Sequence, residues 1–346
     1  MGKRSRWKPV ALVFMASFVI AWIIVLVGSD VFGFGKGWDN VEIEVKTEEA
    51  DVISVSKMLK KNGVIKSRCL FVLYEFLFRK SGRVKGDWQT GKFLLNRSMG
   101  FGELIRSLTT KPVKTVTVEI IPGTTSYGIA KQLEEKNVCS KAAFLDAIDK
   151  GKFNREFLQK IPKSVVPFSL LEGYLFPDKF EFYEDQDPMM VIEKFFDAFE
   201  KKVWPTLREA SSPLTTHEII TIASIVEKEA GSGDGTEGVA AVFVNRLRNP
   251  QKFPRLESDA TLRFYKIVTA QYPELATTER EEAYNSYVAK GVILGPICSP
   301  SRRSIEAVLH PPKSEDFFFV SDKEGKIYFA ETFAEHRGNV KKVSSG

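Results

Sequence analysis

Two glutamates, Glu227 and Glu229, lie near the end of the otherwise apolar run HEIITIASIVEKEAG, which begins at His217 and ends at Gly231. The run is predicted to be a helix, because at about 100° per residue its isoleucine, alanine and valine side chains gather on one face. A carboxyl group at the end of such a helix can be partly desolvated, which raises the pKa of the acid and suits it to general acid catalysis. The alternative is a solvated, charged helix end, which is the more common meaning of a Glu-Lys-Glu triplet.

The helical geometry separates the two glutamates. They are two residues apart, so they lie on different flanks of the buried stripe, while Lys228 points roughly toward solvent. Ile220 and Ile225 tilt the apolar face slightly toward the side of Glu229. Periodicity alone therefore leaves both glutamates at borderline positions, with a weak preference for Glu229 as the buried one.

Composition narrows the class of protein. The 346 residues are 43% hydrophobic and 27% charged, which indicates a globular chain of two or three domains. The net charge of +6 is modest and comes without a cluster of basic and aromatic residues, so we expect no nucleic-acid partner. The three cysteines are scattered and the three histidines lack ligand spacing, so we expect no disulfide framework, no metal site and no cofactor.

An uncharged, mostly apolar segment at residues 9–29 is long enough to span a bilayer. Four basic residues precede it in residues 1–8, and Asp30 is the first charge after it. The positive-inside rule then predicts a cytoplasmic tail at 1–8 and a single-pass anchor at 9–29 in the cytoplasmic membrane, with the rest of the chain outside the cytoplasm. The alternative is a cleaved signal peptide, but the apolar run is long for one and no clear cleavage site follows it.

The segment after the anchor contains a glycine-rich stretch and then a faint repeat. Residues 30–40 are predicted to be a linker. The segment Lys57–Val64 resembles Lys131–Val138, and each copy follows a strand-like run and precedes a second apolar helix. This pattern predicts two units of strand, helix, turn and helix, although common helix composition could also produce it by chance.

The rest of the chain reads as a mixture of helices and strands. Prolines between residues 161 and 188 are interpreted as a domain boundary, and they enclose the aromatic segment Leu171–Asp178, which suits either sugar binding or a packed hinge. Helices are predicted at 188–203, 216–230, 238–247 and 301–309, polar loops or caps at 256–262 and 284–287, and a hairpin at 317–329. The expected fold class is α+β.

Seven short runs occur in an order and spacing that resemble the bacterial endolytic murein transglycosylase family, also called YceG-like. They are Glu172–Asp178, Ala223–Glu229, Val242–Leu247, Leu256–Asp259, Tyr284–Tyr287, Gly295–Ile297 and the hairpin followed by Ala334–His336. The resemblance extends from about residue 115 to the C-terminus, and the N-terminal anchor also agrees. It implies a LysM-like region at 41–160 and a catalytic domain at 161–346.

The resemblance also implies a function and a site. The family members are lytic transglycosylases that cut MurNAc-GlcNAc bonds inside peptidoglycan strands, and their catalytic glutamate corresponds to Glu229. Peptidoglycan, the membrane and glycan-synthesis enzymes of elongation or division would be the partners. Supporting roles are expected of further residues in or beside the matched motifs, whose alternative is capping and loop hydrogen bonding: Glu227, Glu172, Asp178, Asn245, Asp259, Tyr284, Asn285 and His336.

This sequence departs from the family pattern at Glu257, Ala260 and Ser301, where the family usually has glutamine, proline and glycine. Glu257 would add an acid near the cleft. None of the departures removes the proposed acid Glu229. Two other functions stay open: a non-catalytic peptidoglycan-binding or division scaffold, and a muramidase that uses Glu229 with Glu227 or Asp259 as its second carboxylate.

Overall fold

The structure is a computed structural model that describes residues 28–83, 86–110, 112, 114–162, 168–231 and 233–344. The predicted cytoplasmic tail, 1–8, and the predicted anchor, 9–29, lie outside these ranges except for Gly28 and Ser29. Among the residues that the structure describes, no helix is both long enough and apolar enough to span a bilayer.

The chain divides by its internal contacts into two compact units, Met1–Thr115 and Val116–Gly346. Residues 116–160 therefore pack with the C-terminal half, whereas the sequence suggested a boundary in the proline-rich segment after residue 160. The assignment of 41–160 as LysM-like and of 161–346 as catalytic stays a prediction.

The first unit is built on a two-stranded antiparallel sheet. Strands β1 (Asn40–Val45) and β2 (Gly91–Asn96) pair so that Ile43 lies opposite Phe93. Helices α2 (Val52–Lys61) and α3 (Arg68–Lys80) come between these strands in the chain, after a short 3-10 turn at Thr47–Glu49, and α4 (Phe101–Thr109) follows them. Alternate strand residues face the helices and are buried, as period-2 patterning requires.

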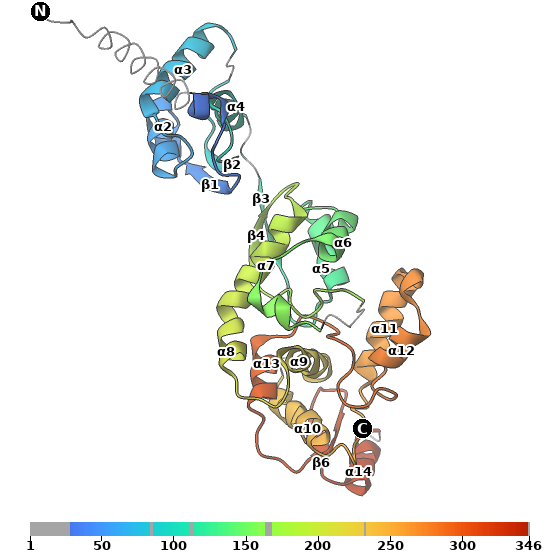
Figure 1. The fold of residues 1–346 in the computed structure, drawn as a ribbon. Helices are drawn as coiled ribbons and strands as arrows, with labels where there is room; N and C mark the ends of the chain where they lie inside the picture. The colour runs from blue at the N-terminus through green and yellow to red at the C-terminus, as the bar shows by residue number, and fades with distance from the viewer. Residues whose placement is uncertain are drawn as a thin grey trace, which may run out of the picture. The chain divides into compact units, whose positions relative to one another are not determined.

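The second unit contains the remaining elements (Figure 1). They are β3 (Thr115–Glu119), α5 (Ser126–Glu135), α6 (Lys141–Lys150), a 3-10 turn at Glu156–Lys160, β4 (Lys179–Tyr183), α7 (Pro188–Lys202), α8 (Trp204–Glu209), α9 (Thr216–Ala230), α10 (Thr236–Arg248), α11 (Asp259–Gln271), a 3-10 turn at Pro273–Leu275, α12 (Thr278–Tyr284), α13 (Arg302–Leu309), β5 (Phe318–Ser321), β6 (Ile327–Ala330) and α14 (Phe333–Ser344). These elements confirm the α+β fold class.

The predicted repeat is visible in the order of elements. In the first copy, α2 and α3 come after β1 and before β2 in the chain, and β1 pairs with β2. In the second copy, α5 and α6 come after β3 and before β4, and β3 pairs with β4. The strand, helix, turn and helix of each predicted copy are therefore confirmed, and the two copies fall in different compact units.

The aromatic segment Leu171–Asp178 packs inside the second unit. Leu171, Tyr174 and Leu175 are at most 1% exposed, so their side chains contribute to the core and do not face a ligand. Gly173 has φ +84°, and a Cβ atom there would lie 2.6 Å from Pro296 Cβ, so both the backbone conformation and the packing require glycine. The sequence allowed either sugar binding or a packed hinge; the packing is observed, and the hinge stays a prediction.

The sequence predicted a polar loop or cap at 256–262; Ser258 is the N-cap of α11, and the loop interpretation is wrong from Asp259 onward. Helix α11 begins there and buries Ala260, Phe264 and Val268, which are spaced four residues apart. Helices α8, α12 and α14 were also not predicted from the sequence.

Candidate active site

Helix α9 carries both glutamates of interest and begins with a capping box. The Thr215 hydroxyl accepts a hydrogen bond from the Glu218 amide at 3.2 Å, and the Glu218 carboxylate accepts one from the Thr215 amide at 2.7 Å. Most of the helix is buried, and it packs against α10 and α13, as Figure 1 shows. The helix ends at Gly231, whose φ of +59° suits glycine, so Glu229 lies in the last turn.

Glu227 is a buried structural partner of helix α13. Its side chain is 6% exposed, and its Oε2 accepts hydrogen bonds from the Ser301 amide at 2.9 Å and the Ser304 hydroxyl at 2.7 Å. Ser301 is the N-cap of α13, so the Glu227 carboxylate lies at the N-terminus of that helix, where a negative charge is favourable. Both of its hydrogen bonds serve to join α9 to α13.

Glu229 is only partly buried and faces a cleft of about 490 Å³. Its Oε1 accepts a hydrogen bond from the Ser258 hydroxyl at 2.5 Å and a longer one from the Ala260 amide at 3.4 Å. The hydrogen bonds that described residues donate to this carboxylate all reach Oε1, and none reaches Oε2. One oxygen is thus fixed by the protein, while the other is free to meet a substrate.

Ser258 is itself held by a buried network. Its amide donates to the Ser286 hydroxyl at 2.8 Å, and the Ser286 hydroxyl donates back to the Ser258 carbonyl at 3.0 Å. The Thr261 hydroxyl lies 3.0 Å from the Ser286 hydroxyl and donates to the Ser258 carbonyl at 2.8 Å. Because Ser258, Ser286 and Thr261 are at most 3% exposed, this network gives the Ser258 hydroxyl a defined position against Glu229.

The residue before Ser258 has a strained backbone. Glu257 has φ +57°, a left-handed conformation that side chains other than glycine, asparagine and aspartate adopt rarely and at a cost of about 1–3 kcal/mol. Its carboxylate accepts a hydrogen bond from Arg246 Nη1 at 2.8 Å, and its amide donates to the Ser286 carbonyl at 3.1 Å. This sharp turn presents Ser258 to Glu229.

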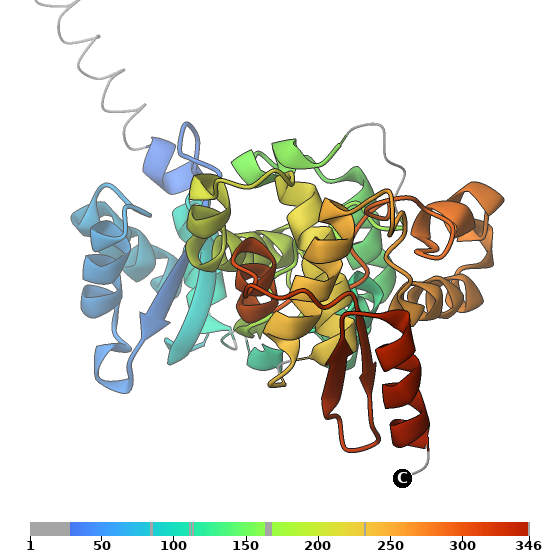
Figure 2. The same ribbon diagram turned by 90° about the horizontal axis from the view of Figure 1, so that it is seen from below.

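Arg246 joins three segments at the wall of the cleft. Its Nε donates to the Phe317 carbonyl at 2.8 Å, its Nη1 donates to the Leu256 carbonyl at 3.1 Å, and its guanidinium lies 5.2 Å from the Phe318 ring centre. At 7% exposed, it is a buried cation that holds the β5–β6 hairpin against α10 and the Leu256–Ser258 segment. Figure 2 shows that hairpin with α14 beside it.

The cleft lining combines charged and aromatic side chains. The lining residues are Glu229, Arg246, Leu256, Glu257, Ser258, Asp259, Arg263, Tyr287, Phe318, Phe319, Val320, Ser321, Phe333, His336 and Val340. The Tyr287 hydroxyl donates to Asp259 Oδ1 at 2.9 Å. Partial burial, and then the Asp259 carboxylate, raise the pKa of Tyr287 to about 12, so the phenol keeps its proton at neutral pH.

His336 lines the cleft from α14. Its ring stacks on Phe318 with centres 5.4 Å apart, and its Nδ1 has no hydrogen-bond partner among the described residues. Burial, and then the Arg246 cation, lower the pKa of His336, so the imidazole is neutral near pH 7. It is a neutral, flat surface at the rim of the site.

Of the predicted site residues, Glu229, Asp259 and His336 come together in the cleft, and the others lie elsewhere. Glu172 is buried, where its carboxylate accepts from the Ser126 amide and hydroxyl, and burial raises the pKa of Glu172 to about 7. Asp178 pairs with Lys202.

The two asparagines and Tyr284 have structural positions. Asn245 Nδ2 donates to the Ser314 and Asp316 carbonyls at 2.8 and 3.0 Å, which fastens the segment before β5. Tyr284 is fully buried against aromatic rings of the core. Asn285 Oδ1 accepts from the Tyr287 amide at 2.9 Å, which shapes the turn that brings Tyr287 to the cleft.

Several residues of the site were not singled out from the sequence: Ser258, Tyr287, Arg246 and Arg263. The first three lie inside runs that carried the family resemblance, so motif position was an available signal. Nothing local in the sequence distinguishes Ser258, however, because its importance depends on a carboxylate 29 residues earlier in the chain.

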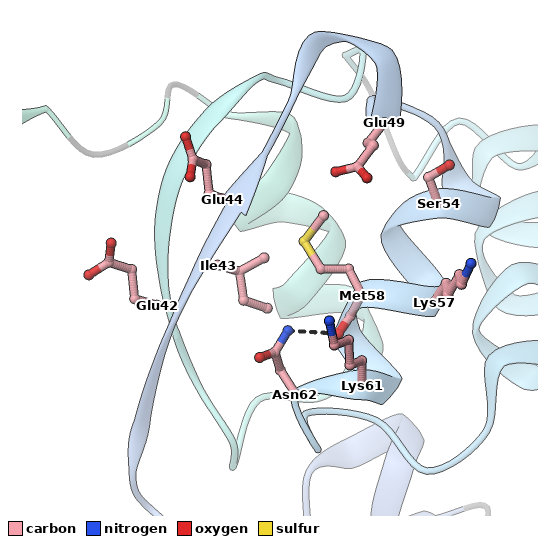
Figure 3. Close-up of a pocket in the computed structure, with 9 residues that line it drawn as sticks. All are labelled: Glu42, Ile43, Glu44, Glu49, Ser54, Lys57, Met58, Lys61 and Asn62. Carbon is pink, nitrogen blue, oxygen red and sulfur yellow. Dashed lines mark hydrogen bonds between the residues drawn. The ribbon is translucent and has the colours of Figure 1, made fainter.

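A second hollow, of about 520 Å³, lies in the first unit between β1 and α2 (Figure 3). Ile43 and Met58 form its apolar part, and the Asn62 side-chain amide donates to the Met58 carbonyl at 3.0 Å. Its remaining lining residues carry charges of both signs or a hydroxyl: Glu42, Glu44, Glu49, Ser54, Lys57 and Lys61. The hollow is therefore polar and of mixed charge, and it holds none of the predicted site residues.

Known proteins resemble this chain over most of its length. An endolytic murein transglycosylase of Bacillus subtilis (strain 168) is 28% identical over 310 residues, which cover 86% of this chain and 83% of that protein. One of Streptococcus pneumoniae serotype 2 (strain D39) is 28% identical over 319 residues, and there the alignment covers 85% of this chain but 56% of that protein. The chain thus corresponds to only about half of the pneumococcal relative.

A solved structure supports the fold. The crystal structure of a yceG-like protein from Listeria monocytogenes matches with a TM-score of 0.51 at 24% identity, over 88% of this chain and 100% of that one. The family model described as the YceG-like family matches residues 43–342, which extend over parts of both units and include every residue that lines the cleft around Glu229. This chain therefore belongs to the YceG-like family.

Proposed function

We propose that this protein is a lytic transglycosylase that cleaves MurNAc-GlcNAc bonds within peptidoglycan strands, with Glu229 as the single acid and base. The observation that carries the proposal is the position of Glu229, partly buried in the cleft with Oε1 held by Ser258 and Oε2 free of described partners. The names of the relatives, endolytic murein transglycosylase, support the reaction class.

The reaction needs one carboxyl group in two states. Protonated Glu229 donates to the glycosidic oxygen as the bond to the muramic C1 breaks. The resulting carboxylate takes the proton from the muramic C6 hydroxyl, whose oxygen bonds to C1 and closes a 1,6-anhydro ring. The proton count balances, and no water is consumed. Ser258 donates to Oε1 throughout, so the carboxyl group keeps its orientation in both steps.

The cleft supports a sugar substrate. Aromatic side chains offer flat faces to the apolar CH surfaces of sugar rings, and Phe318, Phe333 and Tyr287 line the cleft. Asp259 and Arg263 supply polar groups for sugar hydroxyls, and the Asp259 side chain is the one placed to offset the positive charge of the oxocarbenium-like transition state. We assign supporting roles to Asp259 and His336, and structural roles to the predicted residues outside the cleft.

A muramidase is the second candidate, because Asp259 lines the same cleft as Glu229 and would provide a second carboxylate. The products distinguish the two reactions. The full chain in detergent is incubated with purified peptidoglycan beside Glu229→Gln, and the fragments are analysed by mass. Anhydro-muramic ends that the variant does not form support the transglycosylase, reducing ends support the muramidase, and no cleavage by folded wild type leaves a binding scaffold.

The setting of the reaction is also proposed. Residues 9–29 anchor the protein in the cytoplasmic membrane with its N-terminus inside, and the residues from about 30 onward lie outside the cytoplasm. The LysM-like assignment of 41–160 belongs to this proposal, with the mixed-charge hollow of Figure 3 as a second contact for the glycan strand. Cleavage there would release nascent strands from the glycan-synthesis enzymes and set their length, so deletion of the gene should lengthen the strands.

A further inference from the structure

We propose that a groove between α2 and α3 docks on the lipid headgroups of the membrane that anchors the chain, with a preference for anionic lipid. The α2–α3 groove has a volume of about 910 Å³ and is lined by Ile53, Ser56, Lys60, Lys66, Ser67, Arg68, Cys69, Val72, Leu73 and Phe76. The proposal rests on the membrane anchor put forward above, and it adds a surface that the glycan-cleaving reaction does not use.

Helix α3 is apolar on two faces, and only one of them is covered. Phe71 is fully buried in the core of the first unit, with Leu70 and Tyr74 packed beside it. Leu73 and Phe76 are 53% and 59% exposed. A helix with apolar side chains all round normally lies in a protein interior or against lipid, so the exposed face of α3 is a candidate for a partner.

The exposed face continues onto α2 and along α3. Cys69, Leu73 and Phe76 recur at helical spacing and therefore share one side of α3, and Leu77, 52% exposed, lies next to them. Ile53, from the first turn of α2, is 59% exposed and completes the apolar floor. Side chains of this kind partition favourably into the boundary between headgroups and acyl chains.

The charge at the groove favours an anionic surface. Lys60, Lys66 and Arg68 line it, and none of its described lining residues is acidic. A protein partner of mixed charge would have no carboxylate to pair with here. Each basic side chain close to an anionic membrane surface strengthens binding about fivefold.

The groove adjoins the end of the predicted anchor. Lys66 Nζ donates to the hydroxyl of Ser29, the last anchor residue, at 3.0 Å. The Asp30 carboxylate, 1% exposed, accepts from the Lys66 and Ser67 amides at 2.8 Å each and pairs with Lys36 at 3.2 Å. The sequence suggested that residues 30–36 belong to a linker, but Asp30 and Lys36 are thus bonded to the rim of the groove or to each other. If the chain leaves the bilayer at Ser29, this rim lies close to the lipid headgroups.

The test uses the full chain in lipid nanodiscs and a fluorophore on the exposed native thiol of Cys69. Cys139→Ser removes the partly buried thiol, and Cys298 is buried. Discs of phosphatidylcholine and phosphatidylglycerol carry a lipid with a nitroxide near its headgroup, which quenches fluorophores at that depth. A matched control has Glu44→Cys with Cys69→Ser, because Glu44 is exposed in the same unit but lines the other hollow.

We expect strong quenching at position 69 and weak quenching at position 44, with less quenching at position 69 in discs of phosphatidylcholine alone. Lys60→Glu with Arg68→Glu should lower the ratio of docked to undocked chains about fivefold or more for each side chain. The same samples are assayed for anhydro-muramic ends, and the charge-reversed chain should keep the wild-type rate. Loss of all glycan cleavage with the quenching intact would contradict the proposed reaction and leave the docking supported.

Three outcomes overturn the docking. Equal quenching at positions 69 and 44 would show that no face is preferred. Protection of the Cys69 thiol from maleimide, without quenching of a fluorophore at position 69, would indicate a second copy or another protein in the groove. A chain that does not co-purify with the discs would refute both the anchor and the docking.

Discussion

A matched pair of substitutions, Glu227→Gln and Glu229→Gln, tests the division of labour between the two glutamates of α9. Both changes keep the shape of the side chain and remove its charge. Glu227 is 6% exposed and bound to Ser301 and Ser304, whereas Glu229 is partly exposed and bound chiefly to Ser258. The structure therefore predicts that one variant loses stability and the other loses activity.

The expected stability change follows from the hydrogen bonds. A hydrogen bond to a charged acceptor contributes about 1.5–3 kcal/mol to the free energy of unfolding, and one between neutral groups contributes about 0.5–1.5 kcal/mol. Glu227→Gln should therefore lower the free energy of unfolding by about 1 kcal/mol for each bond. Its two bonds give about 2 kcal/mol, which lowers the Tm of a unit of this size by about 4–8 °C. Glu229→Gln weakens one short bond in a partly hydrated site and should lower Tm by at most half as much.

The expected activity change runs the other way. Loss of the general acid should slow glycan cleavage about 10²–10⁴-fold in Glu229→Gln, while folded Glu227→Gln keeps a rate within a few-fold of wild type. Thermal melting followed by circular dichroism gives the Tm of each variant. Release of anhydro-muropeptides, measured well below both Tm values, gives the rate of glycan cleavage. A Glu227→Gln protein that melts like wild type and releases no product would reverse the assignment and refute the reasoning.

Three further predictions concern neighbouring groups. Ser258→Ala removes the 2.5 Å bond that orients Glu229, so it should lower kcat about 10–100-fold with little change in KM, and equal loss in Ser258→Ala and Ser258→Thr would argue against orientation by the hydroxyl. Tyr287→Phe frees Asp259 from its 2.9 Å partner and should alter glycan cleavage without lowering Tm by more than a few degrees, whereas an unchanged rate and KM would exclude a role in the cleft. Burial raises the pKa of Glu172 from an ordinary 4.5 to about 7, so the folded state binds the proton more tightly than the unfolded state. The protonated carboxyl group therefore adds roughly 3 kcal/mol to the free energy of unfolding below pH 4.5, and this stabilisation is lost as pH rises through about 7. Melting of wild type and Glu172→Gln across pH 4.5–8 measures it, and parallel curves would contradict it.

Local patterns in the sequence were sufficient for several elements. Helix α9 was predicted at 216–230 and is observed at Thr216–Ala230, because a capping threonine, a buried stripe and a terminal glycine all lie within one short segment. The hairpin of β5 and β6 was predicted from two apolar runs around a glycine turn.

Helix α11 was missed although its pattern was present. Ala260, Phe264 and Val268 recur every four residues, but polar residues at the start, Glu257 to Asp259, suggested only a loop or a cap. The residues at the start of a helix are often polar because they cap it, so a polar segment before a periodic run is also consistent with a helix N-terminus. The motifs identified the family, and the family model matches residues 43–342.

The sequence by itself determined that Glu227 and Glu229 end a buried helix, and it left both at borderline positions on that helix. Its weak preference for Glu229 as the buried one was wrong, because Glu227 is 6% exposed and Glu229 is only partly buried. Only the tertiary structure separated them, because the groups that hold each carboxylate come from distant parts of the chain. Ser301 and Ser304 are 74 and 77 residues beyond Glu227, and Ser258 is 29 residues beyond Glu229. Helical periodicity reports how far a side chain is turned toward the core, but the hydrogen-bond donors that it meets there depend on how α13 and the Ser258 turn pack against α9.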